Sequence, residues 1–201
     1  MNRALIALFL APAAAVSLSG CGVNSIPTAE EKAKKEWADV EAAFQRRANL
    51  VNNLVETVKA SAGAENKTLT EVTRARASAT QVKLTGDQLS DPEAMRRFAE
   101  AQSNLSAAIL PLQRMQEAYP DLKSQGNFPI LIHELEGMEN RVNIEIGDYN
   151  EAVQAYNTRI RTFPAVIGAK VIYGSKPLAP YRSVTANADV APTVNFGTNS
   201  Q

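Results

Sequence analysis

The segment from residue 127 to 163 carries the longest apolar repeat in the chain and constrains the fold more than any other feature. Its apolar side chains recur at steps of three and four, the spacing that places them on one face of an α-helix. No segment alternates apolar and polar residues for long enough to predict a sheet. The chain is therefore expected to be all-α. The repeat consists of Phe128, Leu131, Leu135, Met138, Val142, Ile146, Tyr149, Val153, Tyr156, Ile160 and Phe163.

Three earlier segments have the same spacing. The first helix is expected over 28–62, opening on a capping box that begins at Thr28. A second is expected to start near Leu69 and end before Gly86, and a third to begin after Asp91. Helices joined by short turns pack as antiparallel neighbours. The predicted architecture is an elongated, antiparallel four-helix up-and-down bundle.

A targeting signal precedes the first helix. The chain opens with a short basic start, and the apolar run 5–16 is too short to cross a bilayer, which takes about 20 residues. Leu18-Ser19-Gly20-Cys21 then resembles the lipobox of bacterial lipoproteins, in which the signal is cut before the cysteine and the sulfur is diacylated. Two or more acyl chains anchor a protein stably. We expect residues 1–20 to be removed, Cys21 to be lipidated and 21–27 to form a tether.

Lipidation would place the protein in the cell envelope, with its helices outside the cytoplasm. By resemblance to Gram-negative lipoproteins, Gly22 after the cysteine favours the periplasmic face of the outer membrane. Cys21 is the one cysteine, so no internal disulfide can form. The chain has 21 basic and 21 acidic residues and no basic cluster, which argues against nucleic acid as a partner.

The C-terminal part differs in composition from the helices. Residues 165–174 are apolar enough to fold back onto the end of the bundle, so the helical domain is expected to cover 28–174. From Ser175 onward Pro, Ala, Asn, Ser and Thr dominate and apolar residues are isolated. Such a composition cannot bury enough apolar surface to order the chain. A disordered tail is therefore predicted over 175–201.

Several short motifs occur in the order and spacing of one known family. They are NLVETVKA (53–60), LTEVTRARA (69–77), YPDLKS (119–124), NF (127–128), ENR (139–141), YNEAVQAYN (149–157) and FP (163–164). Together they resemble the LemA family over about residues 29–174. The resemblance implies a long α-helical bundle that is held at a membrane by an N-terminal hydrophobic segment and lies outside the cytoplasm. It implies no catalytic residue and no cofactor.

The residues themselves do not indicate catalysis. His133 is the one histidine, and its neighbours Leu131 and Leu135 belong to the core stripe, so His133 is expected to face solvent. A di-metal carboxylate bundle would need histidines on two helices. Neither a nucleophile elbow nor a glycine-rich phosphate loop is present. We expect no enzymatic activity, no metal site and no cofactor.

A set of polar residues flanks the apolar stripes at positions that would face a neighbouring helix. They could line a binding groove or partner surface. The alternative, which we favour, is an interhelical hydrogen-bond network that fixes the register of the helices, since buried polar groups must be paired. The set consists of Asn53, Glu56, Thr73, Arg76, Glu139, Asn140, Arg141, Asn150 and Asn157.

The leading functional hypothesis is a membrane-anchored, non-catalytic scaffold that contacts other envelope proteins, or itself, through its helical faces. The apolar residues Ile130, Ile132 and Ile144 lie off the main stripe and suggest a second apolar surface. The alternative hypothesis is a carrier of a lipid or small hydrophobic ligand in the bundle core. Direct membrane remodelling is disfavoured, because the helices lack a basic amphipathic face.

Overall fold

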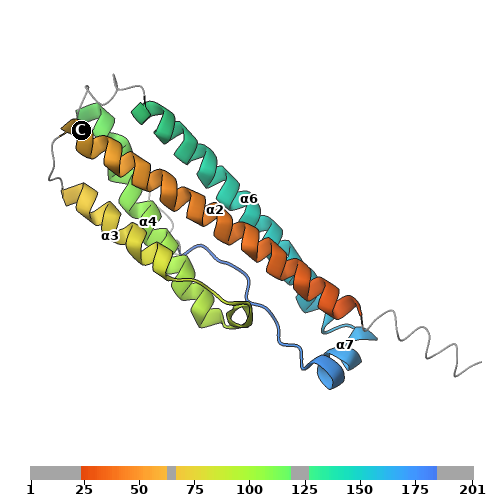
Figure 1. Cartoon of the computed structure of the whole chain (residues 1–201). Helices are drawn as coiled ribbons and strands as arrows, with labels where there is room; N and C mark the ends of the chain where they lie inside the picture. The colour runs from red at the N-terminus through yellow and green to blue at the C-terminus, as the bar shows by residue number, and fades with distance from the viewer. Residues whose placement is uncertain (1–23, 63–66, 119–126, 185–201) are drawn as a thin grey trace, which may run out of the picture.

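Four long helices form the body of the part of the chain that the structure describes (Figure 1). The computed structural model describes residues 24–62, 67–118 and 127–184. The long helices are α2 (Ser25–Ala62), α3 (Lys67–Gln81), α4 (Pro92–Ala118) and α6 (Asn127–Arg159). No strand occurs in these three ranges, so the predicted all-α class is confirmed.

Three short elements complete the described part of the fold. The 3₁₀ helix η1 (Gly86–Ser90) joins α3 to α4. The single turn α7 (Ala165–Gly168) continues directly into the π-helical turn η2 (Ala169–Tyr173). In Figure 1, α7 lies at the end of the molecule where α2 begins. The apolar segment 165–174 is therefore placed at the bundle end, as predicted.

The long helices pack most closely as two pairs. α2 lies along α6 and α3 lies along α4, while contacts between α2 and α3 join the pairs. The colour gradient of Figure 1 shows that the two helices of each pair run in opposite directions. On the remaining side, α4 and α6 face each other across a groove.

The helix boundaries differ from the prediction at two ends. α2 begins at Ser25 rather than Thr28, and the Thr28 Oγ1 donates to the carbonyl of Asn24 (3.0 Å) within the helix instead of capping it. Residues 25–27 are therefore helical and not part of a tether. α6 ends at Arg159, before the predicted Phe163. By contrast, the predicted start of α4 is confirmed, because the Asp91 Oδ1 accepts a hydrogen bond from the backbone N–H of Glu93 (2.9 Å).

The hydrophobic core has two separate parts. The first core holds the early half of α2, the start of α4 and the later half of α6, with Trp37, Phe98 and Tyr149 in edge-to-face ring contacts. The second core holds the later half of α2, α3, the later part of α4 and the start of α6. Ile132 belongs to this second core, so its predicted place on an outer apolar surface is wrong.

Residues 175–184, which we call the strap, cross the side of the bundle in an extended conformation. Leu178, Ala179 and Tyr181 are buried in the first core. The prediction of disorder from Ser175 onward is therefore wrong for the strap. Its few apolar residues suffice because α6 and η1 hydrogen-bond its backbone, a contribution that composition does not reveal. The rest of the predicted tail, 185–201, lies outside the described residues.

Candidate interaction site

A buried arginine separates the two cores. Arg47, on α2, is only 1% exposed, although it carries a charge. Its Nη1 donates to the Ser106 Oγ (2.9 Å) on α4 and to both carboxylate oxygens of Glu139 (3.1 and 3.2 Å) on α6. Its Nη2 donates to the side-chain and backbone oxygens of Gln102 (2.8 and 3.2 Å). One guanidinium therefore joins three helices.

Burial of this charge is offset by its partners. Removing an ion from water costs several kcal/mol unless a counter-charge and hydrogen bonds replace the solvent. The planar guanidinium supplies parallel donors that a lysine cannot match. Its carbon Cζ also lies 4.9 Å from the centre of the Phe44 ring, a cation–π distance. Glu139 keeps 37% of its side chain exposed, so the counter-ion remains partly solvated.

We call Arg47 and its partners Gln102, Ser106 and Glu139 the polar layer. Gln102 extends it to a fourth helix. Its Nε2 donates to the backbone carbonyl of Ala79 on α3 (3.1 Å), while its Oε1 accepts from Arg47. The Nε of Arg76, also on α3, donates to the carbonyl of Ala48 on α2 (2.8 Å). These two bonds join α3 to α2 and to α4 at defined positions.

The groove between α4 and α6 has a volume of about 520 Å³ and lies beside this polar layer. Both polar and apolar side chains line it, and Leu110 is a large apolar residue that remains 54% exposed there. A mixed lining of this kind is compatible with a protein partner, because protein interfaces combine apolar and polar area. The lining includes Arg47, Ser103, Ser106, Leu110, Glu139, Asn143, Ile146, Tyr181 and Val184.

Two asparagines on α6 hold the strap. The Nδ2 of Asn157 donates to the carbonyl of Leu178, and its Oδ1 accepts from the Leu178 N–H (both 2.8 Å). Asn150, two helical turns earlier, pairs with the backbone of Tyr181 in the same way (3.0 and 2.8 Å). The N–H of Ala179 donates to the carbonyl of Leu89 (2.8 Å) on the opposite side. The strap is therefore bound through its backbone, as an added β-strand would be.

Tyrosines reinforce this attachment. The Tyr149 hydroxyl donates to the carbonyl of Ala179 (2.9 Å), and the Tyr156 hydroxyl donates to that of Lys176 (3.2 Å). The Tyr181 ring packs near the rings of Phe44 and Phe98. Burial raises the pKa of Tyr181 to about 12 and also raises the pKa of Tyr149, because a phenolate would lose its hydration there.

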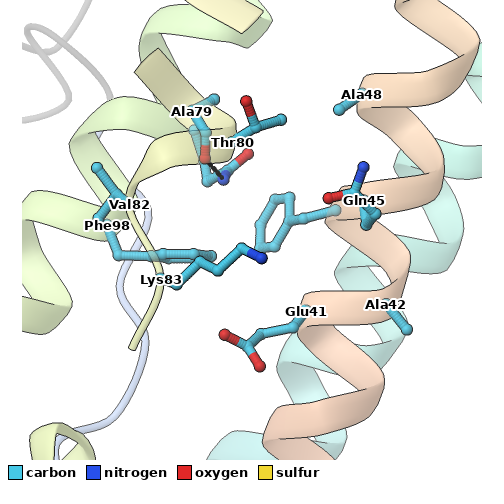
Figure 2. A pocket seen from close by; sticks show the side chains of 11 residues that line it. Glu41, Ala42, Gln45, Ala48, Ala79, Thr80, Val82, Lys83 and Phe98 are labelled. Carbon is cyan, nitrogen blue, oxygen red and sulfur yellow. Dashed lines mark hydrogen bonds between the residues drawn. The ribbon is translucent and has the colours of Figure 1, made fainter. Parts of the chain in front are cut away.

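A second, smaller cleft opens between α2 and the α3–α4 pair (Figure 2). Its volume is about 260 Å³. Figure 2 shows the Lys83 ammonium and the Glu41 carboxylate at the side of the cleft that faces the start of α2. Burial raises the pKa of Glu41, and the nearby Lys83 charge offsets part of that effect. Phe44 and Gln102 line both this cleft and the groove, so the two hollows are close neighbours.

One group of carboxylates in the described residues could hold a cation. Oxygens of Glu36, Asp39 and Glu145 lie within 4.8 Å of one another. Lys35 pairs with Glu36 and Asp39 (3.3 and 2.9 Å), and Arg141 pairs with Glu145. A cation would have to displace these ammonium and guanidinium partners, so the group is already part of an ion-pair network.

The structure brings together only some of the polar residues that the sequence singled out. Glu139 and Arg76 make interhelical contacts of the kind that a register network would need. Asn150 and Asn157 do not, because they bond the backbone of the extended strap instead of a neighbouring helix. The others stay on the surface of their own helices. Asn53 and Asn140 are exposed, Glu56 pairs with Lys59, Arg141 pairs with Glu145, and the Thr73 Oγ1 donates to the carbonyl of Leu69. Cys21 lies outside the described residues.

The central residues of the polar layer, Arg47 and Gln102, were missed by the sequence reasoning. A signal for Arg47 exists. On α2, Arg47 lies three residues after Phe44 and four before Val51, both of which belong to the apolar stripe. The helical spacing therefore predicts a core residue at position 47. A charge on the core stripe indicates a buried ion pair. His133, by contrast, has a side chain that is 91% exposed, as predicted.

The described residues form an all-helical protein in which buried polar contacts around Arg47 and Gln102 join the long helices. The chain belongs to the LemA family, because the family model matches residues 36–196. That match extends past Gly174 and includes the strap. No curated protein matches the chain. Within the described ranges, no helix combines the length and apolar character that a membrane crossing requires.

Proposed function

We propose that this LemA-family protein is a lipid-anchored, non-catalytic interaction protein of the bacterial cell envelope. Its helices form an elongated, antiparallel four-helix up-and-down bundle, and the groove between α4 and α6 receives a segment of a partner protein. The groove is the observation that carries this proposal, since it combines about 520 Å³ of space with exposed apolar and polar side chains.

The strap supports a protein segment as the occupant. Its own Tyr181 and Val184 line part of the groove, so an extended chain is already accommodated there. Asn150 and Asn157 bind that chain by its backbone, a mode that is indifferent to most side chains. The rest of the groove, around Leu110 and Asn143, is lined by α4 and α6 and fits a second extended segment of mixed polarity.

The lipid anchor rests on the sequence Leu18-Ser19-Gly20-Cys21. Two acyl groups on Cys21 would bind the chain stably to a membrane. α2 begins at Ser25, only four residues later, so the membrane would lie close to that end of the bundle. The non-catalytic role rests on the exposed position of His133, whose Nδ1 lies 3.9 Å from the Oε2 of Glu136 on the same helix.

Site-specific photocrosslinking in cells tests the proposal. A photoreactive residue at Leu110 or Asn143, in the groove, is expected to give the same discrete adduct, which mass spectrometry can identify. The same residue at Ile144, an exposed apolar position of α6 that does not line the groove, is the matched control. Equal adducts from Ile144 and Leu110, or none from the groove, would contradict the proposed binding surface.

One observation favours the alternative, a carrier of a small hydrophobic ligand. The cleft in Figure 2 has an apolar side formed by residues that include Val82 and Phe98. Its volume of about 260 Å³ is below the roughly 300–1,000 Å³ of typical ligand pockets. Native mass spectrometry of the purified protein would reveal a carrier as a bound mass that disappears in a Val82→Trp variant, in which the cleft is filled.

A further inference from the structure

The bundle end formed by α7 and η2 carries a concentrated apolar surface. We call it the end patch and define it by the large exposed residues of one short segment. Phe163 is 81% exposed and Val171 is 78% exposed, values that are unusual for such side chains. The other large exposed apolar residues in the described ranges are spread over α4, α6 and the strap. The end patch consists of Phe163, Ile167, Val171, Ile172 and Tyr173.

The local sequence is arranged so that small residues face inward. Ala165, Gly168 and Ala169 are buried against the bundle end, whereas Ile167, Val171 and Ile172 project into solvent. An ordinary surface helix does the reverse and buries its large apolar residues. The turn is also closed firmly, since the Ser175 N–H donates to the carbonyl of Ala169 (2.9 Å) and Gly174 adopts a left-handed φ of 57°. The outward position of the large residues is therefore built into the fold.

The end patch lies at the end of the bundle nearest to Cys21. α7 contacts α2, and Figure 1 shows α7 beside the start of α2. Only four peptide units separate Cys21 from Ser25, and a fully extended chain of that length spans at most about 15 Å. Acyl chains on Cys21 would therefore hold the end patch within reach of the lipid surface.

The charge of the same segment fits an anionic membrane. Residues 159–176 contain four basic residues and no acidic residue. All four are exposed, as expected for side chains that meet lipid headgroups, and they belong to the same stretch of sequence as the end patch. They are Arg159, Arg161, Lys170 and Lys176. The chain as a whole is neutral, so this basic segment is a local feature and not a consequence of composition.

We propose that the end patch is a membrane-docking surface, which inserts its apolar side chains into an anionic lipid surface while the four basic residues contact headgroups. This inference rests on the proposed lipid anchor of Cys21. The acyl chains supply the affinity, because five side chains in one short segment add only a limited apolar area. The end patch supplies orientation: it fixes the bundle end against the bilayer, so that α4, α6 and their groove project away from the membrane.

Fluorescence quenching in vesicles tests the docking. The full-length lipoprotein is reconstituted in phosphatidylethanolamine–phosphatidylglycerol vesicles, and an Ile172→Cys variant is labelled with an environment-sensitive fluorophore. Lipidation blocks the Cys21 sulfur, so wild-type protein should take up no label. Nitroxide-labelled lipids are expected to quench the probe at 172 at least threefold more than a probe in an Ile130→Cys variant. Ile130 is similarly exposed but lies at the opposite end of α6.

A second variant and a second quencher complete the test. Adding Val171→Glu should lower lipid quenching at 172 at least threefold, while the protein still sediments with the vesicles. Full access of aqueous iodide to the probe at 172 would overturn the docking. Protection from both iodide and lipid quenchers would overturn it too, because a protein partner would then cover the end patch. Protein that fails to sediment and takes up label at Cys21 would contradict the anchor and the docking together.

Discussion

The Nη1 of Arg47 lies 3.1 Å from the Oε1 of Glu139, joining two helices across 92 residues of sequence. The same guanidinium also reaches Gln102 through its second terminal nitrogen. We predict that Arg47→Lys destabilises the protein by about 2 kcal/mol or more. A lysine ammonium lacks the planar fork of donors with which Arg47 reaches both partners, and hydrogen bonds to charged groups contribute about 1.5–3 kcal/mol each. Urea unfolding followed by circular dichroism measures the change.

Arg46 provides the matched control for this substitution. It is the adjacent residue on α2 and is exposed. Arg46→Lys should shift the free energy of unfolding by less than about 0.5 kcal/mol, as surface substitutions usually do. If both variants lost a similar amount of unfolding free energy, the loss in Arg47→Lys could not be attributed to the buried contacts of Arg47.

Because Asn157 bonds the backbone of the strap, replacing it should loosen the strap locally. Asn157→Asp removes the amide donor to the Leu178 carbonyl and places a carboxylate oxygen beside it. The expected cost is about 1–2 kcal/mol, since a buried carbonyl loses its partner. Hydrogen exchange at the amides of Leu178 and Tyr181 should accelerate, whereas exchange in the middle of α4 should not. Asn140→Asp, at an exposed position of the same helix, should leave the strap unchanged.

Two glycines should respond to alanine in opposite directions. Gly147 lies exposed inside α6 and a Cβ there would meet nothing within 4 Å. Gly147→Ala should therefore stabilise the protein by about 1 kcal/mol through helix propensity. Gly174 has a φ of 57°, so Gly174→Ala should destabilise it by about 1 kcal/mol. Thermal unfolding of both variants beside wild type checks the prediction. A stabilised Gly174→Ala variant would mean that the left-handed turn after η2 is not required.

Buried tyrosines should make the protein sensitive to alkali. Burial raises the pKa of Tyr181 to about 12, above the value of about 10 in an unfolded chain. Between these values the unfolded state loses its proton first, so stability should fall as pH rises from about 10 to 12. Tyr181→Phe removes this titration and should reduce the fall by up to about 2 kcal/mol. Denaturation curves at pH 9 and at about pH 11.5 provide the comparison. An equal fall in both proteins would show that Tyr181 does not contribute.

The lipid anchor makes a prediction that is independent of the bundle. Cys21→Ser removes the sulfur that would carry the acyl chains. Metabolic labelling with an azido-fatty acid should mark the wild-type protein and fail to mark the variant. Continued labelling of the Cys21→Ser protein would contradict the assignment of the lipobox.

The sequence predicted the helices well because the formation of each helix depends on signals that lie close together in the chain. The repeat from Phe128 onward and the Asp91-Pro92 start are both readable over a few turns of helix. The strap could not be predicted in this way, since its stability comes from Asn150 and Asn157 on a distant helix. The position of Arg47 on the stripe of α2 indicates its burial, but its partners Glu139 and Gln102 could not be predicted, because only the packed helices bring them near. Periodicity indicates which face is buried but not which partner it meets.

The polar layer around Arg47 divides the interior of the bundle into two separate cores. On one side of the layer, the first core is tied to the strap and to the bundle end near Cys21. On the other side, the second core depends on α3 and on the ends of α2, α4 and α6. Units with separate cores can open at different free energies. We therefore expect the half that lies away from Cys21 to open at a free energy of its own, which differs from that of the half that holds the strap.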